Sequence, residues 1–142
     1  MENHSLILAS TSEIRRKLAS KFDSSIKFYS PTADEDALKK TLQGMEPAQL
    51  CYELAKAKSL SINHEFPNHL VLGCDQICLL ENKIFSKPRT VDRAIHQLKE
   101  LSGKTHYLIG QYVFSKDNSV IHEVEIICTC LLYTSDAADD SG

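Results

Sequence analysis

The feature that most constrains this fold is a pair of short apolar runs, one near the N-terminus and one in the middle of the chain. SLILA spans residues 5–9, and HLVLGC spans residues 69–74. Runs of this length and composition are typical of strands that are buried, with helices covering both faces of the sheet. The chain has 142 residues, enough for one domain with its own core. The two runs therefore predict an α/β fold.

Helical patterns separate these strands. The hydroxyl residues 10–12 can cap a helix over about residues 13–21, and Pro47 suits the first turn of a helix that reaches about Ile62. A third helix begins after Thr90 and ends at Gly103, where a left-handed residue is needed. This helix carries an apolar stripe of Ala94, Ile95, Leu98 and Leu101.

The remaining segments predict further strands and a mixed sheet. Residues 26–29 form a second strand, whereas the acidic segment at residues 32–40 begins as a loop. Asp75 ends the strand over residues 69–74. Tight hairpins are expected at residues 81–82 and 116–119, each between apolar segments. Because hairpins pair strands in antiparallel fashion, the sheet is expected to be mixed and twisted, with flanking helices.

Composition excludes several classes of function. The net charge of −3 argues against a general nucleic-acid binder. No run of about 18 apolar residues is present, and the N-terminus lacks the basic and apolar regions of a signal peptide, so we expect no membrane partner. Five cysteines form no CxxC pair, which favours a reducing, cytoplasmic location. The six histidines show no zinc-ligand spacing.

The last thirteen residues, CLLYTSDAADDSG, differ from the rest of the chain. They contain three Asp and no Lys or Arg, and they lack an amphipathic period. The stretch resembles one reading frame of a transposase sequencing adapter. We interpret residues 1–129 as one protein domain and residues 130–142 as an adapter-derived, disordered tail, with natural sequence lost beyond Thr129. The alternative is a natural disordered acidic tail.

Asp75 is the most informative polar residue. It follows a buried strand, at the sheet edge where open α/β folds bind ligands. A carboxylate there suits a general base or, beside a cation, a metal ligand. The alternative is an Asp that only ends the strand by accepting backbone hydrogen bonds. Glu35, between Asp34 and Asp36, is a second candidate for Mg²⁺, although an acidic run is commonly a solvated loop.

Basic side chains supply the complementary charge. Arg15 and Arg16 lie in the first turns of the first helix, where the helix dipole disfavours cations, so they are either solvated or bind an anion. Lys87 precedes Pro88, which stiffens its backbone. Lys56 and Lys58 are two residues apart on a helix, so only one of them can point into a cleft. Together with Asp75, these residues suit a polyphosphate and a divalent ion.

Four sequence blocks resemble the Maf family and occur in the family's order within about residues 5–129. They are LILASTSEIRRKL (residues 6–18), YELAKAKSL (52–60), HLVLGCDQICLLENKIFSKP (69–88) and LKELSGKTHYLIG (98–110). The resemblance implies an inosine-triphosphatase-like fold. It also implies a pyrophosphatase that hydrolyses nucleoside triphosphates between the α- and β-phosphates with Mg²⁺ or Mn²⁺. Family members are usually homodimers and continue into a second lobe that this chain lacks.

The resemblance also implies a role for each candidate residue and selects Lys58 over Lys56. Asp75 would accept the proton and, with Glu35, bind the metal. Two positions, Ile14 and Gln76, depart from the better-defined subfamilies, such as those specific for dTTP and UTP, and bear on base specificity. Gln76 resembles both the 7-methyl-GTP branch and a broader alphaproteobacterial-type group. The residues expected to bind the substrate phosphates are Ser12, Arg15, Arg16, Lys58 and Lys87.

Two alternatives to the enzyme remain open at this point. One is a non-catalytic nucleotide-binding protein that regulates cell division, since the family is named after septum formation. The other is an inactive fragment of the enzyme, in which exposed sheet edges reduce stability.

Overall fold

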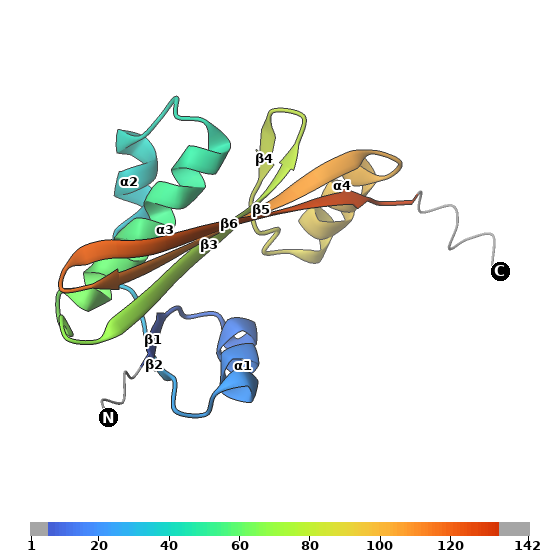
Figure 1. Ribbon diagram of the computed structural model, residues 1–142. Coiled ribbons are helices and arrows are strands. Elements are labelled where there is room, and N and C mark those ends of the chain that lie inside the picture. The colour runs from blue at the N-terminus through green and yellow to red at the C-terminus, as the bar shows by residue number, and fades with distance from the viewer. Residues whose placement is uncertain (1–5, 134–142) are drawn as a thin grey trace. The chain divides into compact units, whose positions relative to one another are not determined.

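The computed structural model describes residues 6–133, which form six strands and four helices (Figure 1). The order is β-α-β-α-α-β-β-α-β-β. The strands are β1 (Leu6–Ala9), β2 (Lys27–Tyr29), β3 (Leu70–Leu80), β4 (Lys83–Phe85), β5 (Thr105–Lys116) and β6 (Ser119–Leu131). The helices are α1 (Glu13–Phe22), α2 (Glu35–Thr41), α3 (Pro47–Asn63) and α4 (Val91–Leu101).

The six strands form one mixed sheet, which confirms the predicted α/β fold. The strand order is β2-β1-β3-β5-β6, and β4 pairs with β3. β1 is parallel to both β2 and β3, whereas β3 and β4 are antiparallel. The chain divides into two compact units, which are residues 1–75 with 111–125 and residues 76–110 with 126–142.

The core of the first unit lies between α3 and the parallel strands. Ile7, Ile62 and Val71 are fully or almost fully buried and form one cluster with Ala9. α3 approaches β3 closely at Gly73, where a Cβ atom would overlap the Ala55 carbonyl oxygen and lie 2.5 Å from the Ser59 nitrogen. The absence of a side chain at this position therefore permits the helix to sit directly on the strand.

A buried pair of hydroxyl groups fixes the same contact. The Ser59 hydroxyl lies 2.9 Å from the Val71 carbonyl oxygen, to which it donates, and 2.6 Å from the Ser115 hydroxyl. Both serines are fully buried. Because unpaired buried hydroxyls are costly, these bonds specify the register of α3 on β3 and β5.

The second unit contains the first predicted hairpin and α4. β3 and β4 pair from Cys78 with Phe85 to Leu80 with Lys83, around a turn in which Glu81 has a positive φ of 57°. The Thr90 side chain caps α4 by accepting a hydrogen bond from the Arg93 N–H, as predicted. Gly103 follows the helix with a φ of 73°, again as predicted.

One prediction about a segment end is wrong. Asp75 does not end its strand, because β3 continues to Leu80 and buries Ile77 and Leu80 beyond it. The acidic segment begins as a loop, as predicted, since residues 32–34 are in no helix or strand. The helix that follows was not predicted: the Asp34 side chain accepts a hydrogen bond from the Ala37 N–H, and α2 begins at Glu35. Acidic residues in a first turn also complement the helix dipole.

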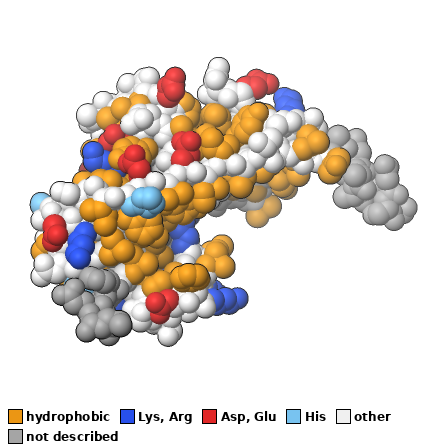
Figure 2. Space-filling view, in the orientation of Figure 1, with side chains coloured by type: hydrophobic (Ala, Val, Ile, Leu, Met, Phe, Trp, Pro, Cys, Tyr) orange, Lys and Arg blue, Asp and Glu red, His pale blue; other side chains and the backbone are white. Residues whose placement is uncertain are grey.

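The C-terminal strand passes the boundary that the sequence suggested. β6 runs to Leu131, and Leu132 forms a bridge with Ser102. Hydrophobic side chains are exposed along β6, including Ile121, Ile126 and Ile127 (Figure 2). The domain boundary at Thr129 stays a prediction, and residues 134–142 of the expected disordered tail lie outside the described residues. Within residues 6–133, every helix is too short or too polar to cross a membrane.

Candidate active site

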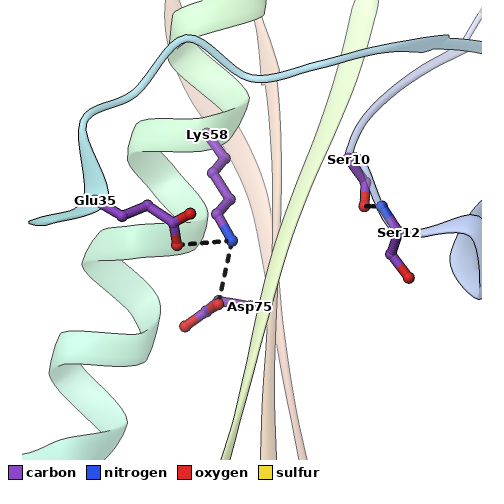
Figure 3. A network of polar contacts seen from close by, with 5 residues as sticks. All are labelled: Ser10, Ser12, Glu35, Lys58 and Asp75. Atoms are coloured by element: carbon purple, nitrogen blue, oxygen red, sulfur yellow. Dashed lines mark hydrogen bonds and ion pairs between the residues drawn. The ribbon is translucent and has the colours of Figure 1, made fainter. Parts of the chain in front are cut away.

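The centre of the candidate site is an ammonium group held between two carboxylates. Lys58 Nζ lies 3.2 Å from Asp75 Oδ1 and 3.1 Å from Glu35 Oε1 (Figure 3). The three residues come from α3, β3 and α2, segments of the first unit that are far apart in the sequence. The structure therefore brings together three residues that the sequence analysis named separately.

The packing of α3 on β3 explains why Lys58 and Asp75 lie in contact. Gly73 and Asp75 are two residues apart on β3, so both face α3. Lys58 precedes the buried Ser59 on the helix, and its side chain is only 12% exposed. Asp75 is 15% exposed and Glu35 is 43% exposed, so the cluster is open to solvent on the α2 side. Lys56, two residues earlier, is not part of this cluster.

Electrostatics keep Lys58 protonated. Burial lowers the pKa of Lys58, but the charges of Asp75 and Glu35 raise it by more, so the pKa lies above its ordinary value. One ammonium between two carboxylates leaves a net charge of one negative in the cluster. An anionic ligand would therefore be favoured here only together with a cation.

Cys51 is a further member that the sequence analysis missed. It is fully buried on α3, and its thiol donates a hydrogen bond to Asp75, while the Gln111 backbone N–H donates to the sulfur. Burial, followed by the Asp75 charge and this hydrogen bond, raises the pKa of Cys51 to about 12. The one available sequence signal was spacing, because Cys51 and Lys58 are seven residues apart and share a helix face.

The start of α1 holds three of the predicted phosphate-binding residues, Ser12, Arg15 and Arg16. The Ser12 hydroxyl caps the helix and accepts a hydrogen bond from the Arg15 N–H. The Ser12 N–H donates in turn to the Ser10 hydroxyl at 3.1 Å (Figure 3). Burial raises the pKa of Cys74, and the positive charge of Arg15 partly opposes this rise.

Arg16 makes two contacts that contribute to the fold. Its Nε donates to the Ser10 carbonyl oxygen at 2.8 Å, and its guanidinium lies 5.6 Å from the centre of the Phe28 ring. These contacts position α1 against β2 while leaving other guanidinium nitrogens available. In residues 6–133, no hydrogen bond or ion pair joins Ser12 or Arg16 to the Lys58 cluster.

The other predicted residues are not in the cluster. Lys87 is exposed in the loop between β4 and α4, and Gln76 is exposed on β3; both belong to the second unit. Ile14 on α1 is 72% exposed, which leaves it free of packing constraints. Their roles in phosphate binding and base specificity stay predictions.

Among the described residues, Glu35 and Asp75 are the predicted ligands of a divalent cation. Across the described residues, no group of three or more His, Cys, Asp and Glu side chains is arranged as a metal site. Mg²⁺ commonly binds one or two protein carboxylates and takes its other ligands from water and substrate phosphates. Glu35 and Asp75 each bind Lys58 through one oxygen, so each carboxylate keeps lone pairs that could serve as such ligands.

Comparison with known proteins gives consistent matches over most of the chain. The family model described as Maf-like protein matches residues 5–138. The 7-methyl-GTP pyrophosphatase of Aliivibrio fischeri is 39% identical over 124 residues, which cover 87% of this chain and 61% of the relative. The nucleoside triphosphate pyrophosphatase of Ruegeria is 38% identical, covering 82% and 59% of the two chains.

A third relative extends the match. The nucleoside triphosphate pyrophosphatase of Legionella pneumophila is 29% identical over 133 residues, which cover 94% of this chain and 66% of the relative. The chain thus spans 59–66% of the length of these curated relatives.

Proposed function

Because the chain belongs to the Maf-like protein family, we propose that the protein hydrolyses nucleoside triphosphates to a nucleoside monophosphate and pyrophosphate. The names of the three relatives above, all pyrophosphatases, support this proposal. The bond broken is the anhydride between the α- and β-phosphates, and water supplies the new oxygen atom.

The observation that carries the proposal is the position of Lys58 between Asp75 and Glu35. An ammonium group has three N–H donors, and two of them point to these carboxylates. The third is available for a phosphate oxygen. A fixed cation beside a fixed carboxylate is what a phosphoryl-transfer site needs to hold the substrate and to activate water.

In the proposed mechanism Asp75 acts as the general base. Water attacks the α-phosphorus in line with the leaving pyrophosphate, and Asp75 accepts the proton that the water loses. Lys58 and Arg15 stabilise negative charge on the phosphate oxygens. The remaining phosphate-binding residues in this proposal are Ser12, Arg16 and Lys87.

A divalent cation, Mg²⁺ or Mn²⁺, would be held by Glu35 and Asp75 together with the triphosphate. When bound, it supplies charge neutralisation on the phosphate oxygens. The net negative charge of the Lys58 cluster supports this, because two carboxylates would otherwise repel a triphosphate.

The proposed base preference rests on the name of one relative. The relative from Aliivibrio fischeri is named for 7-methyl-GTP, and Gln76 and Ile14 are the positions proposed to set specificity. We include 7-methyl-GTP among the substrates on this ground. A cytoplasmic location agrees with five cysteines that form no disulfide in the described chain. A homodimer and a role in septum formation are proposed from the family alone.

The test measures pyrophosphate release from a panel of ordinary and 7-methylated nucleoside triphosphates with Mg²⁺. The wild-type chain should release pyrophosphate and the matching monophosphate. Asp75→Asn should lower kcat at least about 100-fold, because general bases commonly contribute that much. The matched control is Asp36→Asn, an exposed Asp next to Glu35 on α2, which should keep wild-type turnover.

Three results would contradict the proposal. Release of orthophosphate instead of pyrophosphate would show that a different phosphate bond is cleaved. Wild-type turnover in Asp75→Asn would show that Asp75 is not the general base. Thermal stabilisation by a nucleotide with no turnover in the wild type would favour the non-catalytic nucleotide-binding alternative.

A further inference from the structure

The loop between β4 and α4 carries Lys87, and both of its ends are bonded to α4. The loop spans only residues 86–90 and lies entirely within the second unit. At its start, the Ser86 carbonyl oxygen accepts a hydrogen bond of 2.7 Å from Gln97 Nε2. At its end, the Thr90 hydroxyl caps the helix. Lys87 therefore lies between two points of attachment to the same helix.

The residues between these two points have little backbone freedom. Pro88 has a fixed φ, and it disfavours a helical backbone at Lys87, the residue before it. Arg89 has a positive φ of 44°, and the Thr90 N–H donates to the Pro88 carbonyl oxygen. Once Ser86 is held, the backbone of Lys87 is therefore largely defined, and its exposed side chain keeps most of the remaining freedom.

Packing does little to hold the start of this loop. β4 and α4 flank a surface cavity of about 430 Å³, whose lining includes Phe85, Ser86 and Gln97. Ser86 itself is exposed. An ion pair joins the two elements at the other end of β4, where Lys83 Nζ lies 2.8 Å from Glu100 Oε2. The bond from Gln97 thus joins the loop to α4 across a space that apolar packing leaves open.

We propose that Gln97 is a positioning residue, which holds the Ser86 carbonyl so that Lys87 is presented to a substrate phosphate in a fixed place. This inference rests on the proposed function, in which Lys87 binds the triphosphate. Gln97 itself does not contact the substrate. A loop that is ordered before binding loses less conformational entropy when Lys87 binds, which favours affinity. The alternative is that the bond only stabilises the packing of α4 on β4.

Gln97→Met tests this role, because Met has a similar length and helix propensity but no N–H donor. Loss of one hydrogen bond commonly changes an equilibrium constant about 2- to 12-fold. We expect KM to rise in that range with kcat little changed, measured by pyrophosphate release from the triphosphate that the wild type hydrolyses best. The matched control is Gln49→Met on α3, where the side chain donates to Glu53 of its own helix. It should leave both constants unchanged.

A double-variant cycle separates positioning from a general effect on structure. Lys87→Met should raise KM at least about 10-fold, because it removes a charged contact to phosphate. In the Lys87→Met background, Gln97→Met should cause no further rise, since no ammonium group is left to position.

Backbone NMR order parameters test the loop without any turnover. They should fall at Lys87 and Arg89 in Gln97→Met, because the start of the loop is released. In Gln49→Met they should stay at the wild-type values.

Failure of the proposed function and failure of the positioning role give different results. A wild type that releases no pyrophosphate from any triphosphate overturns the proposed function, and this proposal with it. If the wild type is active, the positioning role is overturned by an unchanged KM in Gln97→Met or in Lys87→Met. It is also overturned if Gln97→Met raises KM equally with and without Lys87. A rise in KM that disappears in the Lys87→Met background, together with lower order parameters at Lys87, would establish the proposal.

Discussion

The helices α3 and α4, each within its own unit, show how differently two helices of similar sequence character can be used. α4 has the clearer apolar stripe, yet Ile95 and Leu98 in that stripe are 46% and 54% exposed, and Leu101 is its only buried residue. α3 has a less regular pattern but more burial. Its buried residues are Cys51, Leu54, Ala55, Ser59, Ile62 and Asn63.

The difference in burial between α3 and α4 shows that an apolar stripe predicts a helix but does not predict whether other elements cover that stripe. α3 is buried because Gly73 lets its backbone approach β3 and because Ser59 finds buried partners. Gly73 and the partners of Ser59 belong to the strands beneath the helix, so a pattern within the helix alone does not reveal them. The residues of the candidate site depend on that approach, so the buried helix is the one that carries Lys58.

The largest expected effect is that of Gly73→Ala. The added Cβ would overlap backbone atoms of α3, which cannot move without displacing the helix. We expect a loss of at least about 3 kcal/mol in the free energy of unfolding, measured by urea denaturation. Gly44→Ala is the control: its φ is 90° but it has open space around it, so about 1–2 kcal/mol of backbone strain is expected. If the two variants lose equal free energy of unfolding, the close approach of α3 to Gly73 is not the cause of the loss.

The next largest effect on the free energy of unfolding is the difference between the same substitution, Ile→Ala, in the two helices. Ile62→Ala on α3 should cost about 2–5 kcal/mol, because Ile62 is 1% exposed in the core cluster. Ile95→Ala on α4 should cost less than about 1 kcal/mol, since much of its side chain is already in water. Thermal or urea unfolding of the two variants measures the difference. A larger loss for Ile95 would reverse the comparison.

A smaller effect is expected at Ser59. Ser59→Ala removes the hydroxyl that bonds Val71 and leaves the buried Ser115 hydroxyl without this partner. The expected cost is about 1–3 kcal/mol in the free energy of unfolding. The double variant Ser59→Ala with Ser115→Ala should recover part of the loss. If it loses the sum of the two single effects instead, the two hydroxyls do not act as a pair.

The smallest effect concerns the cap of α4. Thr90→Ala removes the acceptor for the Arg93 N–H and should cost about 1 kcal/mol in the free energy of unfolding. For a helix whose stripe is half exposed, this cap is a large share of the local stability. Amide hydrogen exchange should therefore rise first in α4. Unchanged exchange there would indicate that α4 is held by contacts beyond its cap.

Local signals in the sequence were sufficient for much of the fold. Both hairpins, a cap among residues 10–12, the Thr90 cap and Gly103 were predicted because each depends on neighbouring residues only. The second hairpin turns at Asp117 and Asn118, and Ser12 is the residue that caps α1. The start of α2 was missed because Asp34 was interpreted as part of an acidic loop rather than as a cap. The end of β3 was misplaced because Asp75 was assumed to be too polar for a strand interior, whereas Lys58 and Cys51 satisfy it there.

The site was only partly accessible to the same reasoning. The sequence named Glu35, Lys58 and Asp75 as separate candidates, but their meeting depends on how α2, α3 and β3 pack. Cys51 was missed because a buried cysteine has no chemical signature in the sequence. The groups that shift its pKa besides burial, among them Asp75 and the Gln111 N–H, are distant from it in the sequence.

Thermal unfolding with and without nucleotide and Mg²⁺ tests whether Lys58 binds a nucleoside triphosphate, as proposed. At a nucleotide concentration of 100 Kd the wild type should gain about 2.7 kcal/mol of apparent stability. Lys58→Met should unfold cooperatively but lose this gain, whereas Lys56→Met, two residues away on α3, should keep it. Equal stabilisation of Lys58→Met and the wild type would contradict the account.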